Sequence, residues 1–210
     1  MDKGGKKTPT IHPLLHERWS PRAFSSKAVE EQDLWLLFEA ARWAPSSFNE
    51  QPWAFIVACE SDREVYEQMA NCLSERNRQW ATTAPVLAVC LAKTHFEHNK
   101  KENRHSFYDT GLAVANLVMQ ATDLGISVHQ MAGFSTEKVR EKFLVPPAFE
   151  PVAAMAIGYA GNPARLPSDL RMNKRAARRR KALREFVFGA EWGKPYEFNI
   201  LTEEENRNES

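Results

Sequence analysis

The chain contains 210 residues, with 28 Lys and Arg against 27 Asp and Glu, which gives a formal net charge of +1. This size and near-neutral charge fit one compact globular domain and are not typical of a disordered or fibrous chain. No stretch approaches the roughly 20 consecutive apolar residues that a membrane-spanning helix needs, and the polar first ten residues contain no apolar signal core. We therefore expect a cytoplasmic protein without a membrane partner.

The first half of the chain predicts alternating helices and strands. Residues 29–44 carry apolar residues at helical spacing, with glutamates at the start and Pro45 at the end. Residues 51–59 are short, apolar and rich in strand-forming residues, and a second helical pattern covers 62–73. Residues 85–92 form a continuous apolar run whose length is that of a buried strand.

The longest helical pattern covers residues 107–124, and Gly125 is placed to end it. Small and apolar side chains occupy most of its circumference, so we expect this helix to be central. Residues 127–131 and 151–159 predict two further strands, with a short helix at 135–143 between them. Because helices and strands alternate, the fold class is α/β or α+β.

The cysteines and histidines indicate neither a disulfide framework nor a metal site. The three cysteines show no CxxC spacing, and an odd count favours buried structural thiols. His95, His98 and His105 are the most closely spaced histidines, and they fit a solvated polar segment better than a metal site.

A basic stretch followed by aromatic residues ends the chain. Arg and Lys crowd together between residues 171 and 184, and the aromatic side chains of residues 186–198 follow. So much aromatic surface should pack against a partner, and a second copy of the chain is the economical candidate. We expect a flexible segment at 1–10, a globular domain at 11–188, and an arm and tail at 189–210.

The basic stretch leaves a second function class open. Basic clusters with nearby aromatic residues bind the phosphate backbone of nucleic acids. The near-neutral net charge argues against this interpretation, and the same residues could form an ordinary solvated helix face. We therefore expect no nucleic-acid partner.

Two polar motifs flank the first long helix. Arg18-Trp19-Ser20-Pro21-Arg22 brings two guanidinium groups and a hydroxyl within five residues, and such groups match phosphate oxygens. Taken alone, an ordinary basic surface turn explains this motif better. The second motif covers residues 44–53 and presents two hydroxyls and two carboxamides, which suit the edge of a heteroaromatic ligand. Ordinary turn chemistry explains the second motif alone, but not its combination with the first.

The two motifs together resemble a known family. RxSxRxF, followed after one amphipathic helix by APSSxNxQPWxFIV, resembles the nitroreductase family of FMN-dependent oxidoreductases. The resemblance extends over roughly residues 15–188 and includes Asn77-Arg78-Gln79-Trp80, Asp109-Thr110-Gly111 and Ala132-Gly133-Phe134. It implies a three-layer α/β/α fold of the α+β class with a mixed central sheet, in a homodimer whose C-terminal arms are swapped.

The resemblance also implies FMN as the cofactor and assigns residues to it. Arg18 and Ser20 would hold the phosphate and ribityl chain, and Arg22 would lie near the N1 and O2 edge, where a cation favours the negative charge of the reduced flavin. Asn77 would bond the pyrimidine end, and the backbone of Ala132 or Gly133 would support N5. The cofactor-binding residues expected in one chain are Arg18, Trp19, Ser20, Arg22, Asn77, Trp80, Met131, Ala132, Gly133, Arg178 and Arg180. Those expected to reach the cofactor of the partner are Pro45, Ser46, Ser47, Asn49 and Gln51.

The expected reaction needs no catalytic side chain. NAD(P)H would give a hydride to flavin N5 and leave, and an electron-poor acceptor such as a nitroaromatic or a quinone would then replace it on the same face. Phe48 and Tyr108 are expected to line the substrate cleft. The same fold could instead belong to a flavin carrier or to an enzyme that consumes flavin.

Overall fold

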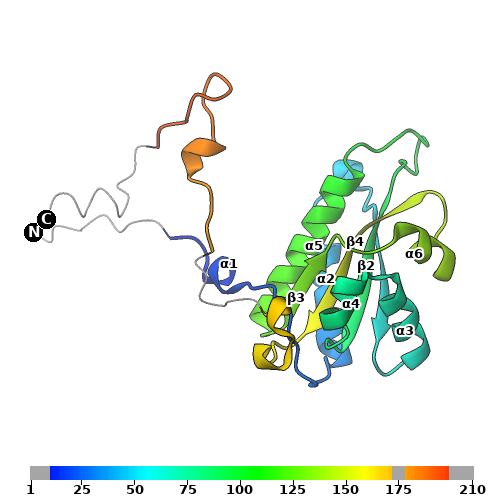
Figure 1. The fold of residues 1–210 in the computed structure, drawn as a ribbon. Coiled ribbons are helices and arrows are strands. Elements are labelled where there is room, and N and C mark those ends of the chain that lie inside the picture. The colour runs from blue at the N-terminus through cyan, green and yellow to red at the C-terminus, as the bar shows by residue number, and fades with distance from the viewer. Residues whose placement is uncertain (1–9, 172–177, 199–210) are drawn as a thin grey trace, which may run out of the picture. The chain divides into compact units, whose positions relative to one another are not determined.

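The computed structural model describes residues 10–171 and 178–198. One compact unit comprises the described residues from Pro13 to Arg171, and a second unit comprises the described residues 10–12 and 178–198. The first unit holds the sheet and every α-helix of the described chain (Figure 1).

Four strands form the central sheet of the first unit. They are β1 (Trp53–Cys59), β2 (Val86–Lys93), β3 (Ser127–Met131) and β4 (Phe149–Gly158), and their order is β1-β2-β4-β3. All three neighbouring pairs are antiparallel, so the expected mixture of parallel and antiparallel pairs is not found among the described strands. The strands β2 and β3 run in the same direction, because each is antiparallel to β4. The two are not neighbours, because β4 lies between them.

Helices cover both faces of the sheet, which confirms the three-layer α+β fold (Figure 1). The helices α2 (Glu31–Arg42) and α5 (Ser106–Asp123) pack on one face. The helices α3 (Arg63–Cys72), α4 (Glu75–Ala81) and α6 (Thr136–Lys142) pack on the other. The remaining helical segments are α1 (Pro13–Glu17) and four short 3-10 turns, η1 (Ser47–Asn49), η2 (Pro163–Arg165), η3 (Ser168–Leu170) and η4 (Leu183–Glu185).

The predicted elements match these strands and the long helices, whereas α4 is not predicted. Its sequence ERNRQWA is polar, and only Trp80 and Ala81 are buried, so it shows too little apolar periodicity to be recognised. Ser74 starts the helix, since its side chain accepts a hydrogen bond from the Asn77 N–H.

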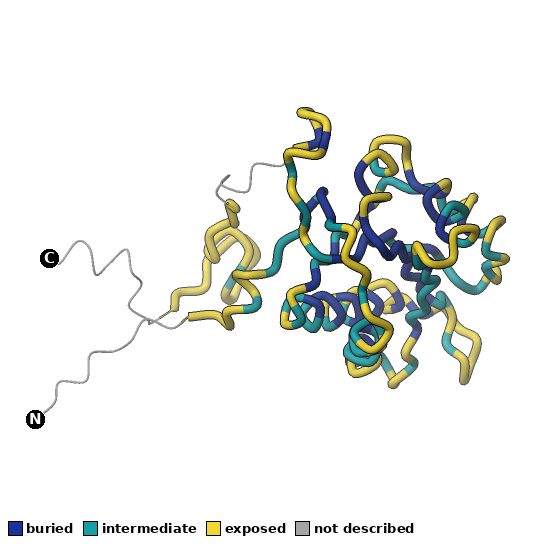
Figure 2. Tube along the Cα trace, turned by 90° about the horizontal axis from the view of Figure 1, so that it is seen from below, coloured by how far each residue is buried: buried dark blue, intermediate teal, exposed yellow. Residues whose placement is uncertain are grey.

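The central strand β2 is buried on both faces. Val86, Ala88 and Cys90 face the α2–α5 layer, whereas Leu87 and Val89 face the layer of α3, α4 and α6. Figure 2 shows buried stretches of the chain in dark blue in the interior of the first unit.

Two of the three cysteines are buried, as expected for structural thiols. Cys72 and Cys90 lie in the core, and Cys59 is half-buried. Burial raises the pKa of Cys90 to about 11, so this thiol stays protonated at neutral pH.

Leu170 is the last buried residue in the described chain, and residues 178–186 are exposed. The expected domain boundary at residue 188 stays a prediction. In the second unit a short turn brings the rings of Phe188 and Trp192 to 4.8 Å. The exchange of this arm between two copies of the chain stays a prediction.

The ends of α5 and α6 share one geometry but use different residues. After α5 the backbone turns left-handed at Gly125 (φ 70°), and the Ile126 N–H donates to the Ala121 carbonyl. After α6 the same turn falls on Leu144 (φ 50°), and the Val145 N–H donates to the Arg140 carbonyl. Glycine suits this position because a Cβ atom crowds the backbone there.

We expect Leu144→Gly to raise the free energy of unfolding by about 0.5–1 kcal/mol, because relief of the left-handed strain exceeds the entropy that glycine gains in the unfolded chain. Urea denaturation measures the change. Leu144→Ala is the matched control, since it removes the same exposed side chain but keeps Cβ, and it should bring no gain. Equal stabilisation by both variants would show that the backbone strain is not the cause.

Candidate functional site

The first basic motif lies alongside β3. The Ser20 hydroxyl donates to the Val128 carbonyl at 3.5 Å, and Arg18 Nη1 donates to Ser20 Oγ at 3.0 Å. His129 Nδ1 lies 2.7 Å from the Pro21 carbonyl oxygen. Because a carbonyl oxygen only accepts hydrogen bonds, Nδ1 carries the proton and donates it. Side-chain and backbone contacts therefore fix the motif to the edge strand β3. Trp19 is half-buried within the motif.

Trp80 supports this contact from the core. Its ring lies 4.4 Å from that of His129, and the residue is only 1% exposed. This burial leaves it no surface for a ligand, so we reassign Trp80 from cofactor contact to support of His129. Burial, followed by the charges of Arg22 and Arg18, lowers the pKa of His129, although its bond to the Pro21 carbonyl acts in the opposite direction.

The lowered pKa of His129 predicts a loss of stability in mild acid. The pKa lies below the ordinary 6.5, so the unfolded chain binds the proton more tightly than the folded one. The contribution is complete above about pH 6.5 and is lost as the pH falls toward the folded pKa. Urea denaturation between about pH 7 and pH 5 should show this slope. His129→Asn keeps a donor for Pro21 but does not titrate, so its slope should be shallower, and an unchanged slope would contradict the assignment.

Asn77 and Gly133 are held together at the end of β3. Asn77 Nδ2 donates to the Gly133 carbonyl at 3.0 Å, and the Ser74 N–H donates to the same oxygen at 2.9 Å. A Cβ at position 133 would lie 2.6 Å from Asn77 Nδ2, so a larger residue there would require the Asn77 side chain to shift from this position. Next to it Ala132 is exposed, whereas the side chain of Met131 is buried, which leaves only its backbone for a ligand.

Arg22 provides the clearest sign of a missing partner. Its Nε atom is buried and has no hydrogen-bond acceptor among the described residues. A buried donor left unpaired costs about 1–3 kcal/mol, and more when the group is charged. An acceptor from a ligand or from another chain would remove this cost.

The second motif folds into a polar loop, residues 45–51, against the start of α5. The Ser47 N–H donates to Asp109 Oδ2 at 3.0 Å, although the two residues are far apart in sequence. Within the loop, the Gln51 N–H donates to Ser46 Oγ and the Asn49 N–H donates to the Ser46 carbonyl, both at 3.0 Å. The loop residues and the first turns of α5 line a cavity of about 330 Å³, with Pro45, Ser46, Ser47, His105, Tyr108, Asp109 and Leu112 around it.

The two residues expected to contact substrate are both exposed. Phe48 is 82% exposed and Tyr108 is 67% exposed. The Phe48 ring also contacts Phe96 and His98, with both centroid distances 5.7 Å. Their role toward a substrate stays a prediction.

One chain thus assembles two groups of candidate residues. The hydrogen bonds of the first group run to β3 and α4, and those of the second run within the polar loop, to α5 and to Glu97. Arg178 and Arg180 are exposed residues of the second unit, and their closure over a phosphate stays a prediction. No group of three potential metal ligands occurs in the described ranges 10–171 and 178–198.

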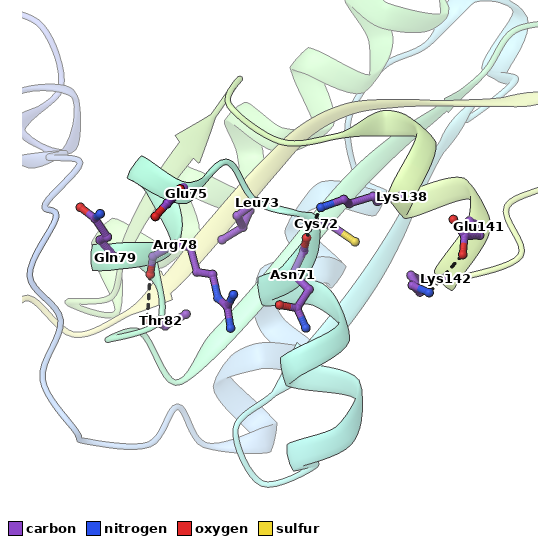
Figure 3. Close-up of a pocket in the computed structure, with 10 residues that line it drawn as sticks. All are labelled: Asn71, Cys72, Leu73, Glu75, Arg78, Gln79, Thr82, Lys138, Glu141 and Lys142. Atoms are coloured by element: carbon purple, nitrogen blue, oxygen red, sulfur yellow. Dashed lines mark hydrogen bonds and ion pairs between the residues drawn. The ribbon is translucent and has the colours of Figure 1, made fainter.

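A separate cavity of about 880 Å³ lies between α3, α4 and α6 (Figure 3). None of the expected site residues lines it. Its cations already have partners, since Lys138 Nζ donates to the Asn71 carbonyl at 3.3 Å and Lys142 pairs with Glu141 at 3.1 Å. None of the buried side-chain atoms that lack a hydrogen-bond partner among the described residues belongs to a residue lining this cavity.

Two structural contributors to the site are not predicted from the sequence, Asp109 and His129. A weak signal for Asp109 exists, because a carboxylate on a buried position of a largely apolar helix needs a partner. Nothing in the sequence around His129 indicates that it bonds the carbonyl of Pro21.

Comparison with known proteins assigns the family. The model of the Nitroreductase family matches residues 15–159, and the chain belongs to this family. A solved structure described as an oxidoreductase containing FMN is 31% identical, with a TM-score of 0.81, and the match covers 91% of this chain and 98% of the other.

Two relatives illustrate how varied the similar proteins are. A protein of Archaeoglobus fulgidus, provisionally named NADH dehydrogenase/NAD(P)H nitroreductase, is 25% identical over 70% of this chain and 83% of its own length. Iodotyrosine deiodinase 1 of Sus scrofa is also 25% identical, over 77% of this chain and 65% of its own length. The expected family is thereby confirmed, and the substrate is not fixed by it.

Proposed function

We propose that the protein binds FMN and uses NAD(P)H to reduce small electron-poor acceptors, such as nitroaromatics or quinones. The observation that carries this proposal is the buried Arg22 Nε, which has no acceptor among the described residues, in a motif within the range that the Nitroreductase family model matches. A similar solved structure is described as an oxidoreductase containing FMN. No helix among the described residues could cross a membrane, and a cytoplasmic location stays an expectation.

The residues of the first group fit the chemistry of FMN. Arg18 and Ser20 offer a guanidinium and a hydroxyl for phosphate oxygens, and they are already hydrogen-bonded to each other. Arg22 would give its unpaired N–H to an acceptor on the ring. Asn77 would face the pyrimidine end, and its bond to the Gly133 carbonyl holds the segment whose backbone would support N5.

When bound, FMN supplies hydride transfer at N5. The chain itself would bind and orient the cofactor and exclude water, with the charge of Arg18 directed to the phosphate and that of Arg22 to negative charge on the ring. Lowering of the His129 pKa keeps that imidazole neutral at neutral pH, so it adds no third charge to the two arginines.

The polar loop would complete the site of a second copy of the chain. Its hydrogen bonds run to α5 and not to β3, which supports its use by a partner in a homodimer. Exposed aromatic residues such as Trp192 (91%) and Phe186 (55%) supply apolar surface for the same association.

The first test is the visible spectrum of the purified protein, followed by release of the chromophore and its separation on a reverse-phase column. Released FMN at about one per chain, with repeated oxidation of NAD(P)H on a nitroaromatic or quinone, is the expected result. A colourless protein that also refuses added FMN would overturn the proposal. Bound FMN without repeated turnover would indicate a flavin carrier, and loss of halide from a halogenated aromatic would move the substrate class toward that of the deiodinase relative.

A further inference from the structure

The start of α5 concentrates the buried polar groups of the protein. Among the described residues, the buried polar or charged side chains are those of Asn103, Ser106, Asp109 and Thr110. Two of their atoms, Asn103 Nδ2 and Thr110 Oγ1, have no hydrogen-bond partner in the part of the chain that the structure describes. Natural proteins retain such unsatisfied groups where a structural or functional need outweighs their cost.

Asp109 is the member of this cluster that bonds to the polar loop. It is 3% exposed, and its Oδ2 accepts the Ser47 N–H at 3.0 Å. The carboxylate lies in the first turn of an 18-residue helix, where the positive end of the helix dipole stabilises it. A charged acceptor makes a stronger hydrogen bond to a backbone N–H than a neutral one does.

The segment that Asp109 holds has an unfavourable backbone. Phe48, Asn49 and Gln51 adopt left-handed φ angles of 54°, 55° and 51°. Such angles in residues with a Cβ persist only where the surroundings fix them, and they concentrate at functional sites. The polar loop therefore needs anchors outside itself to keep its shape.

A second loop, residues 94–103, is tied to the same cluster. The Asn103 N–H donates to the Thr94 carbonyl at 2.7 Å and closes the base of this loop. At its tip the Glu97 N–H donates to Glu50 Oε1 at 2.5 Å, and the Phe96 ring contacts Phe48. The buried cluster thus supports the polar loop directly through Asp109 and indirectly through the second loop.

We propose that Asp109 is a positioning residue that holds the polar loop in its ligand-binding conformation through the Ser47 N–H. The inference rests on the proposed function, because it takes the polar loop as a contributor to the FMN site. Asp109 itself does not touch the reacting atoms. It acts by stabilising the left-handed backbone that presents Ser46, Ser47 and Asn49.

The variants that test this role separate the N–H from the side chains. Asp109→Ala removes the acceptor, and Asp109→Asn keeps an acceptor oxygen but removes the charge. Ser47→Pro removes only the donor and the hydroxyl, because Ser46 already has the extended conformation (φ −147°, ψ 156°) that precedes proline. Ser47→Ala keeps the N–H and controls for the hydroxyl. Asp123→Asn, at the exposed far end of α5, is the matched control for the loss of a carboxylate.

Two readouts are needed, amide hydrogen exchange of residues 46–51 without FMN and FMN affinity measured by flavin fluorescence. We expect Asp109→Ala to accelerate exchange in this segment at least about tenfold and to weaken FMN binding by a similar factor, with Asp109→Asn in between. In the Ser47→Pro background, Asp109→Ala should add no further effect, because the bond is already absent. Asp123→Asn should change neither readout.

The outcomes distinguish this inference from the proposed function. Unchanged exchange and unchanged FMN affinity in Asp109→Ala would overturn the role of Asp109, as would an equal loss from Asp109→Ala in the Ser47→Pro background. If Ser47→Pro does not fold, the exchange rates and FMN affinities of Asp109→Asn and Asp109→Ala still test the role of Asp109. Equal exchange rates and equal affinities in Asp109→Ala and the wild type would reject it. If the wild-type protein binds no FMN, the proposed function fails, and the exchange measurement alone still shows whether Asp109 holds the loop.

Discussion

Replacing Trp80 by alanine is expected to lower the free energy of unfolding by about 3–5 kcal/mol, the range for loss of a buried tryptophan. Trp80 is 1% exposed and belongs to the core cluster that includes Tyr66 and Met69. Its removal leaves a cavity beneath the first basic motif and withdraws the ring that packs on His129. Urea denaturation with a fixed protein concentration measures the loss.

A graded control accompanies this variant. Trp80→Phe retains most of the apolar contact and should lose less stability than Trp80→Ala. Because packing of Trp80 contributes to the burial that lowers the pKa of His129, the acid-dependent slope should also become shallower in Trp80→Ala. A loss below about 1 kcal/mol in Trp80→Ala would mean that the site relaxes around the cavity.

Replacing Arg22 by alanine is expected to weaken FMN binding by about tenfold to a hundredfold, the effect of losing a hydrogen bond from a charged donor. Reduction by NAD(P)H should also slow, because the cation that favours negative charge on the ring is gone. The structural reason is the buried Nε of Arg22, which has no acceptor among the described residues. Flavin fluorescence titration gives the affinity, and stopped-flow absorbance gives the rate of reduction.

Two further variants sharpen the assignment of Arg22. Arg22→Lys keeps the charge but not the planar set of donors, so it should be intermediate. Arg63→Ala removes an exposed cation on α3 that pairs with Glu67, and it should leave FMN binding unchanged. Unchanged affinity and unchanged reduction rate in Arg22→Ala would remove Arg22 from the site.

The arrangement of the two groups gives a chemical reason for the proposed dimer. The first group offers cations and a hydroxyl suited to phosphate, and the polar loop offers hydroxyls and carboxamides suited to a ring edge. In the first group Asn77 is the carboxamide, whereas the polar loop adds those of Asn49 and Gln51. Under the proposed function, association of two chains is what would place them around one cofactor.

The sequence by itself determined the types of most elements and the family. Short apolar runs indicate buried strands and helical spacing of apolar residues indicates a buried helix face, and this suffices for β1, β2, α3 and α5. Gly125 after α5 was also predictable, because the left-handed turn there favours glycine. The nitroreductase motifs likewise depend on residue types at fixed spacing, and the family assignment over residues 15–159 confirms them.

Only the tertiary structure decided which of these residues meet. The bond from Ser47 to Asp109 and the bond from His129 to Pro21 join positions far apart in the chain, and both depend on how the strands and α5 are ordered in space. The insertion of β4 between β2 and β3, which makes every described pair antiparallel, also leaves no local pattern. Trp80 is of a residue type that often contacts ligands, but it lies in the core. The polar sequence of α4 shows no apolar periodicity, so the buried face of this helix is recognised only in the folded structure. Local periodicity records the burial of a face, whereas the partners within that face are set by long-range packing.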